Sequence, residues 1–151
     1  MLVTDAQVAA LHAFLVQDPD TALPLTAQLG DQGMGGYLHL AEAALCVLAG
    51  RRFSPQFTRA DLIRYVASVR ASWIGDSTEY DLDPAAAESV LRYLLGSTDA
   101  RIPDPKQRIR IVVALLDALA ESELSSEADV GALLAEARDL ADQWAANGTR
   151  P

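Results

Sequence analysis

The chain has 151 residues, a formal net charge of −9 and a sequence pI near 4.5. Such an acidic balance disfavours broad binding to nucleic acids or to anionic membranes, because both present negative charge. Half of the residues are hydrophobic and only 6% are aromatic, so the core must consist mainly of aliphatic side chains. The length predicts one domain, residues 1–151, with a core that needs neither disulfides nor a metal.

The number of cysteines and the absence of targeting signals indicate the cellular compartment. Cys46 is the only cysteine, which excludes a disulfide within the chain and fits a reducing environment. The N-terminal segment has no basic region before its apolar residues and is not typical of a signal peptide. No apolar run approaches the roughly 18 residues that cross a bilayer. We therefore expect a cytoplasmic protein with no membrane partner.

Helix start signals recur in chain order, each followed by apolar residues at helical spacing. They are Thr4 with Gln7, Asp18-Pro19, Thr58 with Asp61, Asp83-Pro84, Asp104-Pro105, and Ser126 with Asp129. The predicted helices are residues 4–18, 18–29, 37–52, 58–73, 83–95, 104–123 and 126–147. Four glycines within residues 30–36 predict a flexible turn before the third of these helices. Short connections favour an all-α fold, a compact bundle or orthogonal array of six to seven helices.

The apolar stripes indicate which helix faces are buried. In the helix at 58–73 the stripe is Leu62, Ile63, Val66, Val69 and Trp73. The helix at 104–123 is apolar over more than half of its circumference and is predicted to be central. Its apolar residues are Ile109, Ile111, Val112, Val113, Leu115, Leu116 and Leu119. Glu88 and Arg92 are four residues apart and are predicted to pair on a helix surface.

Positive charge is confined to part of the chain. All twelve Lys and Arg residues follow Gly50, and eleven of them are Arg, a bias that a GC-rich genome also produces. The densest group surrounds the start of the helix at 104–123 and comprises Arg101, Lys106, Arg108 and Arg110. Bases at a helix start oppose the helix dipole. The group either pairs with acids of residues 1–50 or 125–142, or forms a site for an anion or an acidic partner.

Two further arginines are candidates for the rim of a groove. Arg59 and Arg70 are eleven residues apart and border the apolar stripe of the helix at 58–73. Arginines at such borders lay their stems on apolar surface and extend the guanidinium outward. We expect them either to do this or to rim a binding groove.

A metal site is not expected. The residues spaced for one helix face are His39, Glu42 and Cys46, with His12 as a possible fourth ligand. Zinc needs three or four such ligands that converge, and the apolar residues of the same helix predict the opposite face as the buried one. His39 and Glu42 are therefore predicted to face solvent, and no metal or cofactor is assigned.

No catalytic constellation can be recognised in the sequence. We therefore expect a non-enzymatic interaction module that binds another protein through a groove or a charged face. The partner is another protein or a second copy that pairs through the last helix, and nucleic acid is not expected. The alternative is a protein, with or without enzymatic activity, that binds a small anionic ligand near residues 101–110.

Overall fold

The structure is a computed structural model that describes residues 2–53, 55–72 and 82–148. Within these ranges it contains six helices and no strand, which confirms the all-α prediction. They are α1 (Asp5–Leu15), α2 (Pro19–Arg52), α3 (Arg59–Ser72), α4 (Pro84–Leu94), α5 (Pro105–Glu123) and α6 (Glu127–Asn147). None of these helices has the combined length and apolar character that a membrane crossing requires. Trp73, predicted to extend the stripe of α3, lies outside the described ranges.

The six start signals act as predicted, and each of these helices begins one residue after its cap. The Thr4 hydroxyl accepts a hydrogen bond from the backbone N–H of Gln7, and the Gln7 side chain accepts one from the N–H of Thr4. The Asp104 carboxylate accepts from the N–H groups of Lys106 and Gln107. Because a cap satisfies backbone donors that have no partner within the helix, short sequence patterns suffice to place these ends.

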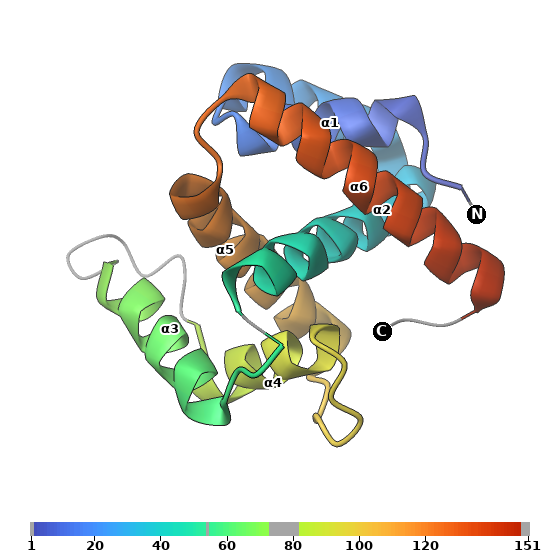
Figure 1. Cartoon of the computed structure of the whole chain (residues 1–151). Coiled ribbons are helices and arrows are strands. Elements are labelled where there is room, and N and C mark those ends of the chain that lie inside the picture. The colour runs from blue at the N-terminus through green and yellow to red at the C-terminus, as the bar shows by residue number, and fades with distance from the viewer. Residues whose placement is uncertain (1, 54, 73–81, 149–151) are drawn as a thin grey trace.

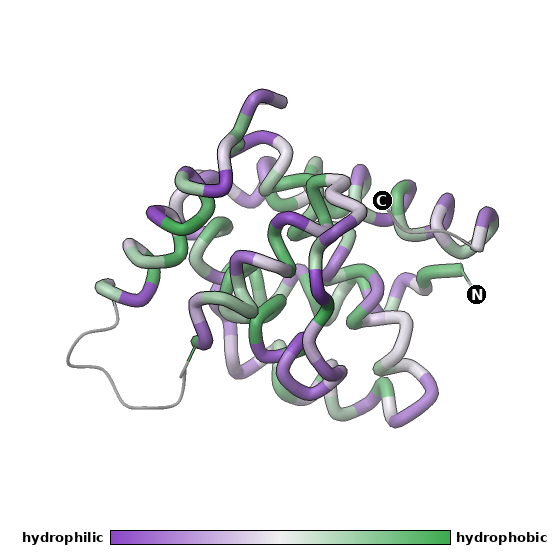
Figure 2. The backbone as a smooth tube through the Cα atoms, turned by 90° about the horizontal axis from the view of Figure 1, so that it is seen from below, coloured by the Kyte–Doolittle hydropathy of each residue, from purple (hydrophilic) through white to green (hydrophobic). Residues whose placement is uncertain are grey.

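Helix α2 is the centre of the fold and packs against α1, α5 and α6 (Figure 1). Helices α3 and α4 pack against each other, and α4 joins them to α5. One cluster of buried apolar residues includes members of all six helices, so they share one core. Figure 2 shows hydrophobic and hydrophilic residues alternating along the helices, as expected for amphipathic helices around a common interior.

The flexible turn predicted at residues 30–36 is wrong in its extent. Only Gly30 leaves the helical conformation, with φ 64° and ψ −175°, and this produces a kink inside α2. That φ favours glycine because it strains other residues. The other glycines of the segment are helical. Position 36 requires glycine for lack of space, because a Cβ atom there would overlap the buried Gln7 amide of α1.

The prediction that His39 and Glu42 face solvent is also wrong. Glu42 is only 8% exposed, and the His39 ring is half-buried, with Nε2 3.0 Å from the carbonyl oxygen of Ala141. The His39 ring also packs edge-to-face against Trp144. Since α5 and α6 both pack on α2, this helix has no fully solvated side along its C-terminal half.

The surface pair predicted in α4 exists but is buried. Arg92 Nε lies 2.9 Å from Glu88 Oε1, and the Glu88 side chain is only 3% exposed. In α3, Ile63 is 52% exposed although it was assigned to the apolar stripe, and Tyr65 takes the buried position. Helix α3 packs against α4, and its buried residues are Leu62, Tyr65, Val66 and Val69.

Candidate functional site

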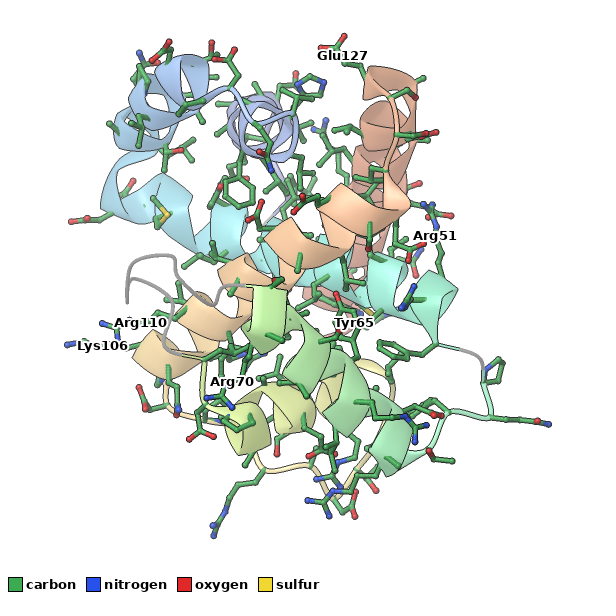
Figure 3. All side chains as sticks on the ribbon, turned by 90° about the vertical axis from the view of Figure 1, so that its left-hand side faces the viewer. Arg51, Tyr65, Arg70, Lys106, Arg110 and Glu127 are labelled. Atoms are coloured by element: carbon green, nitrogen blue, oxygen red, sulfur yellow. The ribbon has the colours of Figure 1, made fainter. Side chains whose placement is uncertain are left out.

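The basic group at the start of α5 does not act as a unit. Arg108 points inward, where its Nε lies 2.7 Å from Glu42 Oε1 and its guanidinium covers the Tyr93 ring at 5.5 Å. Lys106 and Arg110 are exposed and extend outward from the first turns of α5 (Figure 3). Arg101 is exposed in the segment between α4 and α5. The structure thus separates an internal arginine from three exposed basic residues.

The two predicted rim arginines lie on α3 with different surroundings. Arg59 Nε is 3.3 Å from Glu88 Oε1, so this side chain bridges α3 to the buried carboxylate of α4 although it is 66% exposed. Arg70 is exposed in the last turn of α3. A cavity of about 300 Å³ does lie beside α3, but other residues line it. They are Arg52, Phe53, Asp61, Arg64, Tyr65 and Ser68.

The charges in this cavity beside α3 already have partners. Arg52 lies 3.3 Å from Glu123 and also covers the Tyr65 ring at 5.6 Å. Arg64 pairs with Asp61, whose pKa is lowered, chiefly by the backbone hydrogen bond from Thr58. Because each arginine is held by a carboxylate, the cavity offers little free positive charge to an anion.

A larger groove lies on the opposite part of the molecule, across the outer side of α1. Its first section is a cavity of about 490 Å³ whose lining is mostly apolar. The residues that line it come from α1, the turn after α1, the start of α2 and the start of α6. They are Asp5, Val8, Ala9, His12, Ala13, Val16, Asp18, Thr21, Leu25 and Glu127.

A second cavity, of about 370 Å³, adjoins the first and shares Val16 and Glu127 with it. Its other lining residues come from the end of α1, the end of α5 and the start of α6. They are Leu15, Gln17, Ala120, Glu121, Leu124, Ser125, Ser126 and Val130. We name the two cavities together the acidic groove.

The ionisable residues that line the acidic groove are mostly acidic. Among the described residues of its lining there are four carboxylates, Asp5, Asp18, Glu121 and Glu127, and His12 is the only one of basic type. Asp5 pairs with Arg138 at 2.7 Å, and Asp18 accepts the capping hydrogen bond of α2. Glu121 and Glu127 are exposed, and no ion pair joins either of them to another described residue.

A further carboxylate beside the groove feels this negative field. Asp117 accepts a hydrogen bond from the Gln17 side chain at 3.2 Å. Burial raises the pKa of Asp117 above its usual value, and the negative charge of Glu121 raises it further. This end of the molecule therefore favours positive charge, because added cations would relieve the repulsion between its acids.

The sequence did carry a signal for the groove, but it is weak. In α1 and its C-cap, Val8, Ala9, His12, Ala13 and Val16 are spaced so that they share one side of the helix. These residues lie beside the buried face of α1. Because most residues of this helix are apolar, the sequence does not separate the groove face from the buried face. Neither α2 nor α6 can be placed next to it without the tertiary structure.

The described residues contain no group of three or more His, Cys, Asp or Glu side chains arranged to hold a metal ion. Comparison with protein-family models, with curated proteins and with solved structures finds no match to this chain. Any assignment of function therefore depends on the surface of this molecule alone.

Proposed function

We propose that this protein is a non-enzymatic helical interaction module that binds a cationic, partly apolar segment of a partner protein in the acidic groove. The observation that carries the proposal is a lining that combines apolar residues of α1 with the exposed carboxylates of Glu121 in α5 and Glu127 in α6. A basic amphipathic segment would cover the apolar lining and place its cations beside Glu121 and Glu127. Grooves of this kind are used by proteins that recognise a partner helix.

The shape and chemistry of the groove support a peptide in preference to a small molecule. Two open cavities of about 490 and 370 Å³ share Val16 and Glu127, and their lining residues come from four helices, so the site is broad and open. Small-molecule sites are more enclosed and bury most of the ligand surface. The acidic rim also repels phosphate, which disfavours a nucleotide or nucleic acid as the occupant. We place this function in the cytoplasm, since the single cysteine fits a reducing compartment.

A direct test uses a fluorescent Lys/Leu amphipathic helical peptide as the probe. We expect it to bind the wild-type protein and to bind more weakly as salt is raised, because exposed charges are screened. Ala9→Arg places a long cationic side chain on the floor of the groove at an exposed helical position. This variant should bind the probe at least about tenfold more weakly.

The matched control is Ala67→Arg, an identical change at an exposed position of α3. It should bind the probe as the wild type does. A second control is the same peptide with Glu in place of each Lys, which the acidic groove should reject. Equal binding by the wild type and Ala9→Arg, with both proteins folded by circular dichroism, would refute the proposal.

The alternative function, binding of a small anion, is favoured by one observation. Lys106 and Arg110 are exposed at the start of α5, and no described carboxylate pairs with them. Arg108 is no longer available to such a site because Glu42 holds it. A thermal shift with phosphate or sulfate that is lost in Lys106→Ala/Arg110→Ala would support this alternative, and its absence would remove it.

A further inference from the structure

Helix α5 carries opposite charges at its two ends. Its first turns present Lys106 and Arg110, with Ile109 between them at 38% exposure. Its last turns present Glu121, which lines the acidic groove, and Glu123. We name Lys106, Ile109 and Arg110 the basic tip.

This order of charges is unfavourable for the isolated helix. A helix dipole favours acids at the N-terminus and bases at the C-terminus, and α5 has the reverse. Internal ion pairs offset only part of this unfavourable interaction with the dipole. Arg108 pairs with Glu42, and Glu123 pairs with Arg52. Among the described residues, Lys106, Arg110 and Glu121 have no such pair. All three side chains are exposed, so they can contact a second molecule.

The basic tip has the chemistry that the acidic groove selects. Residues 106, 109 and 110 are spaced i, i+3 and i+4, so two cations and an exposed Ile lie on one helix face. The tip belongs to the N-terminal end of a helix already folded in the core, so docking it orders little additional backbone. A preformed helix loses less entropy on binding than a disordered segment does.

The tip cannot reach the groove of its own molecule. In α5, Glu121 of the groove follows Arg110 of the tip by 11 residues, so at 1.5 Å per residue the rigid helix holds them about 16 Å apart. In Figure 3, Lys106 and Arg110 extend from one side of the molecule, whereas Glu127 lies at its upper end. Each molecule therefore presents both surfaces at once, and only another molecule can join them.

We propose that copies of this protein associate head to tail, the basic tip of one copy docking in the acidic groove of the next. This rests on the proposed function of the groove and names a second copy as an occupant. The contact joins two different surfaces, so it is open-ended and builds chains unless a ring closes. The net charge of −9 opposes association at long range, but at physiological salt charges are screened beyond about 8 Å, so the local contacts decide.

The experiment uses two complementary charge-reversal variants and analytical ultracentrifugation. Lys106→Glu/Arg110→Glu removes the tip and keeps the groove, whereas Glu121→Lys/Glu127→Lys removes the groove and keeps the tip. We expect the wild type to gain mass with concentration at physiological salt and each variant alone to stay monomeric. An equimolar mixture should regain association, because the intact tip meets an intact groove and the acidic variant tip meets a basic variant groove.

Controls separate charge at the site from charge in general. Asp139→Lys reverses an exposed acid of α6 outside the groove lining and should assemble as the wild type does. If Glu121→Lys/Glu127→Lys fails to fold, Ala9→Arg replaces it, since it blocks the groove at an exposed position. The tip variant mixed with Ala9→Arg should then give a one-to-one dimer and nothing larger, because the blocked groove keeps Glu121 and Glu127 and rejects the acidic variant tip.

The outcomes distinguish this proposal from the function of the groove. A wild type that stays monomeric at every concentration, yet binds the Lys/Leu peptide, overturns self-association and leaves the groove function intact. A dimer that persists in both variants is symmetric and also overturns the head-to-tail contact. If the groove binds neither the peptide nor the tip, both proposals are refuted.

Discussion

The guanidinium of Arg108 lies 2.7 Å from the carboxylate of Glu42, although the two residues are 66 positions apart in the chain. Both side chains are largely covered, with 19% and 10% of their surface exposed. The contact joins α5 to α2 at the start of α5, where the basic group of the sequence lies. For this arginine the structure decides in favour of internal pairing with an acid of residues 1–50.

Replacing Arg108 by Met should lower the free energy of unfolding by about 3 kcal/mol, because a covered carboxylate loses a cation that compensates its desolvation. Urea unfolding followed by circular dichroism measures this change. The control, Arg110→Met in the same helix, removes an exposed charge and should change the free energy by less than about 0.5 kcal/mol.

The same pair makes a second, sharper test. Adding Glu42→Leu to Arg108→Met removes both charges, so the double variant should regain most of the stability lost by the single one. A double variant no more stable than Arg108→Met would show that the arginine acts through packing on Tyr93 instead.

Adjacent glycines of α2 should respond to alanine in opposite directions. Both lie in the helix, but a Cβ atom at Gly35 meets open space, whereas one at Gly36 overlaps the amide of Gln7. Gly35→Ala should stabilise the protein by about 0.5–1 kcal/mol, and Gly36→Ala should destabilise it by at least about 1 kcal/mol. Thermal unfolding of the two variants checks the signs, and a gain in both would disprove the close approach of α1.

Asp117 gives the protein a defined pH dependence. Burial, and then the charge of Glu121, raise its pKa in the folded state above the ordinary value of 3.8. Its contribution to stability is therefore full below that ordinary value and is lost as pH rises through the folded pKa. Asp117→Asn should match the wild type at acidic pH and exceed its Tm near neutrality.

Thermal melts across this pH range measure the difference between the two proteins. The Asn carbonyl can still accept the hydrogen bond from Gln17, so the comparison isolates the charge. A gain in Tm that is the same at every pH would contradict the role of ionisation. Asp139→Asn, at an exposed site of α6, is the control.

Cys46 should be unreactive in the folded protein. Its Sγ donates to the carbonyl oxygen of Leu94 at 3.3 Å, and burial raises the pKa of the thiol from 9.0 to about 11. Because only the thiolate reacts, modification by iodoacetamide near pH 8 should be about 100-fold slower in the native state than in urea. Similar rates in both states would show that the thiol is accessible.

The sequence by itself predicted where each described helix begins, because a helix start depends on neighbours in the chain. Capping residues such as Thr4 and Asp104 hydrogen-bond to backbone within three positions, and every described helix starts where such a signal stands. The apolar spacing in α5 likewise predicted most of its buried residues. These properties need no knowledge of which helices become neighbours.

Only the tertiary structure decided which polar residues are buried and where the groove lies. Glu42 lies on a polar side of its helix and becomes buried because α5 brings Arg108 to it. The acidic groove combines residues of α1, α2, α5 and α6, so no local pattern contains it. The physical reason is that burial and electric field depend on every element packed nearby, whereas helix formation and capping depend on a few adjacent residues.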